Sequence, residues 1–260
     1  MNLLNIGMKL AKENGLYWTF LYALYWFFRL VLKLDLQCLY NTLIGLEKKH
    51  DLPGFNSSAT AGDVWDLIPW EKERGEEWTI SAGWKQSLID DVLLEYIKPK
   101  TALLEIGPGA GRWTEILQPM AKTLFAVDVS VKAINLCKER FSSAANATFY
   151  LTRDARLEFI PDKTIDAVWS FDVFVHINPD DTDGYLSEFK RVLVPGGIAV
   201  IHHPKEGGLH GGCRSRMTAR MFTVLLEKHG LTLVRQLESW GENDRYNLFR
   251  YRDCISVFHA

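Results

Sequence analysis

From Thr101 onward, apolar strand-like runs alternate with helical stretches, and this alternation constrains the fold more than any other feature. The strand-like runs are TALLEI, KTLFAV, ATFYL, TIDAVWS and GIAVIHH, and the helical stretches between most of them are RWTEILQPM, SVKAINLCKERF and DTDGYLSEFKRVL. Alternating strands and helices form a parallel sheet covered by helices on both faces. Two more strand candidates, within 231–240 and 246–258, follow each other without a helix, so we expect an antiparallel edge pair. The sequence predicts a doubly wound α/β fold.

A glycine-rich loop follows the first of these strands. The strand ends at Ile106, Gly107, Gly109 and Gly111 come at alternate positions, and a helix is expected from Arg112. Glycine lets the backbone turn sharply and approach a ligand closely, and the next helix offers unpaired N–H groups. Dinucleotide enzymes use a related loop, so the glycines alone decide little. Glu105 before the loop and Pro108 within it separate this pattern from theirs.

Carboxylates follow the second and third strands. Asp128 ends the second strand, 17 residues beyond Gly111, where a carboxylate can accept hydrogen bonds from both ribose hydroxyls. The alternative is that Asp128 only caps the next helix, a role that Ser130 can also fill. Asp154 follows the third strand and can accept from an adenine amino group, or it is an ordinary turn aspartate.

These motifs resemble, in their order and spacing, those of class I S-adenosylmethionine-dependent methyltransferases. The resemblance covers about residues 81–258 and rests on Glu105 to Gly111, Asp128, Asp154-Ala155, the segment SFDVFVHI and 193–197. It implies a Rossmann-like sheet of order 3-2-1-4-5-7-6 with an antiparallel seventh strand. It also implies S-adenosylmethionine as cofactor, with the glycine loop along its methionine half. The cofactor-binding residues that follow are Glu105, Gly107, Pro108, Gly109, Gly111, Asp128, Val129, Asp154, Ala155 and Phe171.

The acceptor should lie past the carboxyl ends of the fourth and fifth strands, where open α/β sheets bind ligands. Enzymes of this family that methylate amino groups of nucleic acid usually carry an Asn/Asp-Pro-Pro-aromatic tetrad after strand 4. This chain has Ser-Phe-Asp-Val at 170–173, which argues against base methylation. His176 resembles the general base that small-molecule O-methyltransferases place here, although a lone histidine is more often structural. Asp172 is a candidate residue for binding the methyl acceptor.

The fifth strand and the loop after it supply further candidates. His202 and His203 are reserve catalytic bases, and strand alternation places them on opposite faces, so at most one should face the cleft. The loop KEGGLHGGCRSRMT carries His210, Arg214 and Arg216. It is either a mobile surface loop or an acceptor lid whose arginines hold phosphate or carboxylate. Trp78, Trp84 and Trp113 could cover the cofactor, but core packing is the default reading.

Residues 1–80 lie outside the shared motifs, and we assign them to an N-terminal helical extension and linker before a methyltransferase domain at 81–260. Residues 16–28 carry no charge, and Arg29, Lys33 and Asp35 then interrupt the apolar run. That run is too short for a spanning helix. It predicts either a helix buried against the domain or a partner, such as a second subunit, or an interfacial helix at residues 16–34 on a membrane surface.

Charge and cysteine content exclude some classes of function. The formal net charge is -2, so nothing draws the whole chain to nucleic acid. Four widely spaced cysteines without a CxxC pair argue against a zinc ribbon or disulfide framework and for a reducing compartment, so we expect no metal and a cytoplasmic location.

The sequence therefore favours O-methylation of a glycan, sugar-nucleotide or lipid-linked acceptor. The alternative within the same class is N- or C-methylation of a lipid headgroup or quinone-like precursor. A nucleotide-dependent oxidoreductase and a non-catalytic cofactor-binding scaffold are the more remote hypotheses.

Overall fold

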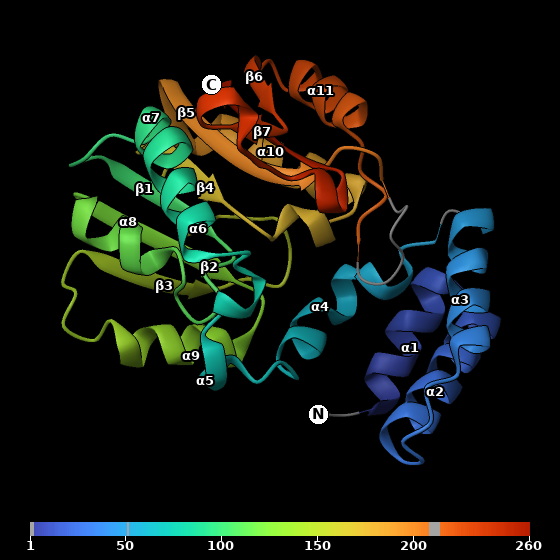
Figure 1. The fold of residues 1–260 in the computed structure, drawn as a ribbon. Coiled ribbons are helices and arrows are strands. Elements are labelled where there is room, and N and C mark those ends of the chain that lie inside the picture. The colour runs from blue at the N-terminus through green and yellow to red at the C-terminus, as the bar shows by residue number, and fades with distance from the viewer. Residues whose placement is uncertain (1–2, 51, 208–213) are drawn as a thin grey trace.

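Seven strands form a single twisted sheet at the centre of the domain, in the order β3-β2-β1-β4-β5-β9-β6 (Figure 1). The computed structural model describes residues 3–50, 52–207 and 214–260. The strands of the sheet are β1 (Ala102–Ile106), β2 (Thr123–Asp128), β3 (Ala147–Leu151), β4 (Ile165–Ser170), β5 (Leu193–Pro204), β6 (Thr232–Leu237) and β9 (Asp253–His259). A short separate ribbon pairs β7 (Ser239–Trp240) with β8 (Tyr246–Asn247).

Strand direction confirms the expected topology. The pairs β1–β2, β1–β4, β2–β3 and β4–β5 are parallel, and β9 runs antiparallel to both β5 and β6. The last two strands do form an antiparallel pair, with β9 inserted between β5 and the edge strand β6. This is the 3-2-1-4-5-7-6 order with an antiparallel seventh strand.

Helices cover both faces of the sheet, each over its own apolar core. On one face lie α6 (Ala82–Leu88), its π-helical continuation η3 (Ile89–Leu93), α7 (Leu94–Tyr96), α8 (Thr114–Met120) and α9 (Val131–Arg140). On the other lie α10 (Pro179–Val192) and α11 (Ala219–Lys228). Trp84, Trp113 and Trp169 fill the first core, and Phe189 and Phe222 belong to the second. Burial from both sides explains why the central strands read as continuous apolar runs.

The helices begin at residues that the sequence marks as caps. The Ser81 hydroxyl accepts a hydrogen bond from Trp84 N at 3.1 Å, and the Ser130 hydroxyl accepts one from Ala133 N at 3.0 Å. Each bond satisfies an N–H that has no partner within its own helix. Ser81 thus marks the start of the helical segment formed by α6, η3 and α7.

A separate helical unit stands beside the domain (Figure 1). It comprises α1 (Leu3–Asn14), α2 (Leu16–Leu30) and α3 (Gln37–His50). Trp18 and Tyr25 on one side of α2 pack with Leu10 and Leu43 in a small core of its own. No described helix is both long and apolar enough to cross a bilayer.

The connection from 54 to 80, which reads as a loop in the sequence, contains several short helical turns. These are η1 (Gly54–Asn56), α4 (Ser58–Trp65), α5 (Trp70–Glu73) and η2 (Glu76–Trp78). Each is too short for an apolar period to be readable, which is why the sequence suggested only turns. We call residues 54–80 the strap, because they run from the helical unit across the domain (Figure 1).

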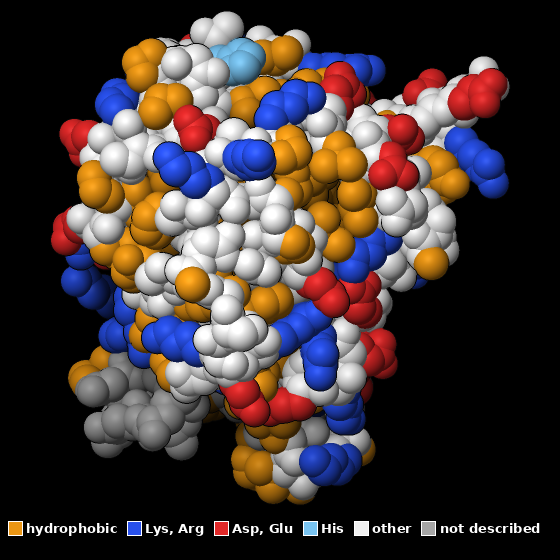
Figure 2. Space-filling model, turned by 90° about the vertical axis from the view of Figure 1, so that its left-hand side faces the viewer, with side chains coloured by type: hydrophobic (Ala, Val, Ile, Leu, Met, Phe, Trp, Pro, Cys, Tyr) orange, Lys and Arg blue, Asp and Glu red, His pale blue; other side chains and the backbone are white. Residues whose placement is uncertain are grey.

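The domain surface opposite the helical unit carries charges of both signs, scattered among hydrophobic side chains (Figure 2). Neither sign dominates this face, in agreement with the small net charge of the chain.

Candidate functional site

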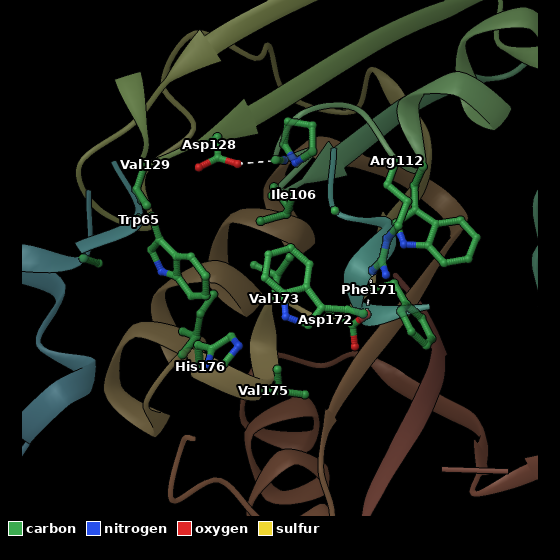
Figure 3. Close-up of a pocket in the computed structure, with 18 of the residues that line it drawn as sticks. Trp65, Ile106, Arg112, Asp128, Val129, Phe171, Asp172, Val173, Val175 and His176 are labelled. Carbon is green, nitrogen blue, oxygen red and sulfur yellow. Dashed lines mark hydrogen bonds and ion pairs between the residues drawn. The ribbon is translucent and has the colours of Figure 1, made fainter. Parts of the chain in front are cut away.

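A pocket of about 490 Å³ opens where β1, β2 and β4 end. The carboxyl ends of parallel strands are the usual ligand site of open α/β sheets. The strap supplies a second wall, so the pocket lies between the sheet and this segment. In Figure 3, Trp65 and His176 lie on one side of the pocket, and Arg112 and Asp172 on the other.

The glycine loop lies on the sheet side of this pocket. Gly107, Gly109 and Gly111 have φ angles of 73°, 55° and 92°, in the left-handed region that favours glycine. Gly107 and Gly109 line the pocket with Pro108, whereas Gly111 lies behind them. A Cβ on Gly109 would lie 2.8 Å from the Trp70 ring, so a side chain there would displace the strap.

Asp128 lies under the loop at the tip of β2. Its Oδ2 accepts a hydrogen bond from Gly109 N at 3.0 Å, and its Oδ1 accepts one from Ser130 N at 2.9 Å. Burial raises the pKa of Asp128 to about 6, against the lowering effect of these bonds. Both oxygens keep further lone pairs, and Asp128 and Val129 line the pocket. The ribose role and the capping role are therefore compatible, with Ser130 acting as the cap of α9.

Asp154 and Ala155 also line the pocket, after β3. Arg156 donates to Asp154 through Nε at 2.8 Å and through its backbone N–H at 3.0 Å. The hydrogen bond from Arg156 is the largest influence and lowers the pKa of Asp154. Part of the acceptor capacity of this carboxylate is thus used locally, as in an aspartate turn.

Glu105 is placed away from the pocket. Its side chain is 1% exposed, and Thr114 Oγ1 donates to its Oε2 at 2.6 Å. Burial raises the pKa of Glu105 to about 8. The residue joins β1 to the first turn of α8 and supports the loop from beneath, without touching the cavity.

Phe171 and Asp172 line the pocket after β4, opposite the strap. Asp172 has a φ of 62°, a backbone conformation that non-glycine residues adopt mainly where the surroundings impose it. Arg112 Nη2 donates to Asp172 Oδ2 at 2.5 Å. The Arg112 side chain is buried and lines the pocket, and its Nη1 has no hydrogen-bond partner among the described residues.

His176 lies where the resemblance expects a base. It is in the 3-10 turn η4 (Phe174–His176) after β4 and lines the pocket. Its ring meets the Trp65 ring edge-on, with centroids 4.9 Å apart. The strap thus provides the surface against which His176 is oriented (Figure 3).

His202 and His203 do not line the pocket, and both side chains are buried. They point to opposite faces of β5 as alternation predicts. His203 stacks on Phe222 at 4.0 Å, and burial lowers its pKa to about 3. His202 lies behind Phe171 and Asp172, because the chain turns over it after β4. Neither ring is placed to contact an acceptor directly.

The arginines of the loop before α11 lie apart. Arg214 lines the pocket, forms an ion pair with the buried Asp253 and lies over the Tyr251 ring. Arg216 is not among the lining residues and lies 3.9 Å from the exposed Asp180. His210, the third candidate of that loop, falls outside the described residues.

Sequence reasoning missed several residues that shape the pocket. The strap contributes Trp65, Trp70 and Trp78, of which the sequence had suggested only Trp78. Arg250 and Tyr251, in η6 (Phe249–Tyr251), join Arg214 at the pocket. Only the clustering of tryptophans at 65–78 was a visible signal, and nothing in the spacing marked η6.

Comparison with known proteins agrees with this geometry. Residues 104–201 match the family model of the methyltransferase domain. Residues 104–201 thus match a methyltransferase domain, and the sheet has the class I methyltransferase order. A TehB-like S-adenosylmethionine-dependent methyltransferase from Corynebacterium glutamicum shares the fold with a TM-score of 0.53 at 21% identity, over 73% of this chain and 92% of that one.

Two curated relatives of this methyltransferase domain differ in how much they share. A demethylmenaquinone methyltransferase of Tropheryma whipplei is 31% identical over 40% of this chain, and the match spans 43% of that protein. Nodulation protein S of Rhizobium tropici is 24% identical over 82% of this chain and 84% of its own length. The first match is confined to less than half of either protein.

Proposed function

We propose that this chain transfers the methyl group of S-adenosylmethionine to a hydroxyl group of a small molecule. The observation that carries the proposal is the pocket itself. It combines a left-handed glycine loop, the buried Asp128 carboxylate and the buried guanidinium of Arg112 in one cavity at the strand ends.

The lining residues fit the cofactor in two halves. Asp128 and Val129 would hold the ribose, with Asp154 and Ala155 near the adenine. The glycine loop would take the methionine half. Arg112 Nη1 is buried and has no partner among the described residues, so it needs a hydrogen-bond acceptor from the cofactor at that end. A carboxylate such as that of the methionine fits an arginine donor.

We expect the wild-type protein to bind S-adenosylhomocysteine and to give no binding heat with NAD in isothermal titration calorimetry. The reason is that the pocket offers one nucleoside site and one amino-acid site rather than two nucleotide halves. Binding of NAD with no response to S-adenosylhomocysteine would support the oxidoreductase alternative and overturn the proposal.

The residues around the pocket would mainly position the acceptor and exclude water. S-adenosylmethionine supplies a methyl group already activated by its sulfonium. His176 would accept the proton of the acceptor hydroxyl, for which a group with a pKa near neutral is best suited. Trp65, Trp70 and Trp78 of the strap would cover the reacting groups and keep water out.

The proposed acceptor is a glycan, a sugar nucleotide or a lipid-linked molecule, and the last two would bring a phosphate to the pocket. The guanidinium carbons of Arg214 and Arg250 lie 5.3 and 5.1 Å from the Tyr251 ring centroid. Two guanidinium groups at one side of a cavity suit an anion, and Asp172 would accept from an acceptor hydroxyl. A labelled-methyl screen over these acceptor classes tests the assignment.

N- or C-methylation of a lipid headgroup or quinone-like precursor is the second candidate. The relative named as a demethylmenaquinone methyltransferase is the observation that favours it. An amine acceptor attacks through its own lone pair and would not depend on His176 as a base, so the effect of replacing that residue separates O- from N-methylation.

We also propose that α2 and the turn after it rest on a membrane surface. Leu16, Tyr17, Phe20, Phe27 and Leu30 are exposed on the side of α2 away from its buried Trp18 and Tyr25. An apolar face edged by Arg29 and Lys33 suits the boundary of an anionic bilayer. The proposed location is therefore the cytoplasmic face of a membrane.

Co-sedimentation with vesicles containing an anionic lipid tests this surface. Replacing Phe20 and Phe27 together with serine should reduce the vesicle-bound fraction at least about tenfold, because two large apolar groups lose their burial. The matched control replaces Met221 and Val224, exposed residues of α11, with serine and should bind as the wild type. Equal losses in both variants would overturn the proposal. A lipid-independent dimer lost only in the first variant would assign the face to a second copy.

A further inference from the structure

A line of five charged or polar side chains runs behind the pocket, across the ends of neighbouring strands. In order it contains Arg112, Asp172, His202, Asp253 and Arg214. Arg112 Nη2 lies 2.5 Å from Asp172 Oδ2, His202 Nδ1 lies 3.2 Å from Asp172 Oδ1, and His202 Nε2 lies 3.3 Å from Asp253 Oδ2. Arg214 closes the line on the other oxygen of Asp253.

Its two ends face the cavity, whereas its centre does not. Arg112, Asp172 and Arg214 line the pocket, but His202 and Asp253 are each 2% exposed and lie behind it. Among the described residues, His202 connects Asp172 on the glycine-loop side to Asp253 on the Arg214 side. A buried group that bridges two carboxylates in this way fixes both of their orientations.

The surroundings of Nδ1 are the second observation. The backbone N–H of Asp172 donates to Nδ1 at 3.1 Å, which requires a lone pair on that nitrogen. The Asp172 Oδ1 atom at 3.2 Å can pair with Nδ1 only if that nitrogen carries a proton. The two contacts call for opposite protonation states, so the position of the Asp172 carboxylate depends on the charge of His202.

We propose that His202 is a positioning residue that, through Asp172, holds the Arg112 guanidinium toward the methionine end of the cofactor. With His202 protonated, Nδ1–H donates to Asp172 Oδ1 and leaves Oδ2 fixed for Arg112. When His202 is neutral, the Asp172 N–H bond keeps a lone pair on Nδ1 and the ring proton lies on Nε2, toward Asp253. The Nδ1 lone pair then faces Asp172 Oδ1, and the carboxylate turns away from its bond with Arg112. This rests on the proposed use of S-adenosylmethionine and deepens it.

The charged surroundings favour the protonated form. Burial by itself lowers the pKa of His202, but the carboxylates of Asp172 and Asp253 beside its two ring nitrogens outweigh burial and raise the pKa above its usual 6.5. Arg112 and Arg214 lie beyond the two carboxylates, Phe171 stacks uncharged on the ring, and the neighbouring His203 stays neutral. The protonated arrangement is present at low pH and is lost as the pH rises through the raised pKa of His202.

Calorimetry with two ligands tests the role of His202. S-adenosylhomocysteine carries the amino-acid end, whereas 5′-methylthioadenosine lacks it. His202→Gln should weaken the binding of S-adenosylhomocysteine about tenfold or more, which is the scale of one hydrogen bond to a charged group. The affinity for 5′-methylthioadenosine should stay within about twofold of the wild type. In the wild type, only the affinity for S-adenosylhomocysteine should fall as the pH rises past the His202 titration, and His202→Gln should remove that dependence.

His203→Gln is the matched control, because it alters the neighbouring, equally buried ring on the opposite face of β5. It should lower the melting temperature without changing either affinity. If His202→Gln does not fold, Asp253→Asn, on the far side of the ring, should show the same selective loss. If His202→Gln weakened the binding of both ligands equally, or kept the pH dependence of the wild type, the role proposed for His202 would be wrong. The proposed function would not be affected. Failure of the wild type to bind S-adenosylhomocysteine would overturn the proposed function itself.

Discussion

Replacing Asp128 with alanine should weaken S-adenosylhomocysteine binding by at least about 100-fold. The carboxylate would accept from two ribose hydroxyls, each such charged hydrogen bond being worth about 1.5–3 kcal/mol. It also holds the loop through Gly109 N and the next turn through Ser130 N, so both N–H groups would lose their partner. Calorimetry with purified protein measures the affinity directly.

Asp154→Ala is the matched control for this result. That carboxylate also lines the pocket, but it is partly engaged by Arg156. We expect its loss to weaken binding by less than about tenfold. An Asp128→Ala protein that bound the ligand as tightly as the wild type, with an unchanged melting temperature, would remove the basis for the cofactor assignment.

The second large effect is expected at His176. If this residue accepts the acceptor proton, His176→Gln should lower kcat by about 10²–10⁴-fold, the usual contribution of a general base. Cofactor affinity should stay within about threefold, because the ring is assigned to the acceptor and not to the nucleoside. Single-turnover methyl transfer, with calorimetry on the same sample, separates the two quantities.

Asp181→Asn is the comparison that this experiment needs. Asp181, at the start of α10, lines the same pocket, and burial raises its pKa to about 6. Like Asp128, it is a lining carboxylate that could take up a proton near neutral pH. If Asp181→Asn lost rate while His176→Gln kept full activity, the role of general base would belong to Asp181. Full activity in both would favour the N-methylating alternative, because an amine attacks through its own lone pair.

The sheet and the glycine loop were predictable from the sequence because their signals are local. Strand runs such as 124–127 are apolar throughout, and the glycines stand at the turn that needs their left-handed conformation. Alternation also predicted that His202 and His203 would point to opposite faces. It could not show that the turn at Asp172 covers His202, since that depends on a backbone angle 30 residues earlier in the chain.

The strap was not predictable for a related reason. Its contacts join residues far apart in sequence: Ser130 Oγ donates to Asp66 Oδ1 at 2.6 Å, and the Trp70 ring lies against Gly109. A stretch of short turns has no period from which such docking can be read. The same holds for Arg250 and Tyr251, which reach the pocket only because of the turn before β9.

The strap also limits how this protein can be divided. A cut at residue 80 follows the predicted domain boundary. However, it would remove Trp65, Trp70 and Trp78 of the strap, which line the pocket together with the glycine loop. The isolated residues 81–260 would keep the sheet, but the glycine-loop side of the pocket would be open to bulk solvent. During evolution, the N-terminal segment and the Rossmann-like domain would therefore have to change together. Replacing residues 1–80 by those of a related protein would also require new pocket-facing residues in the strap.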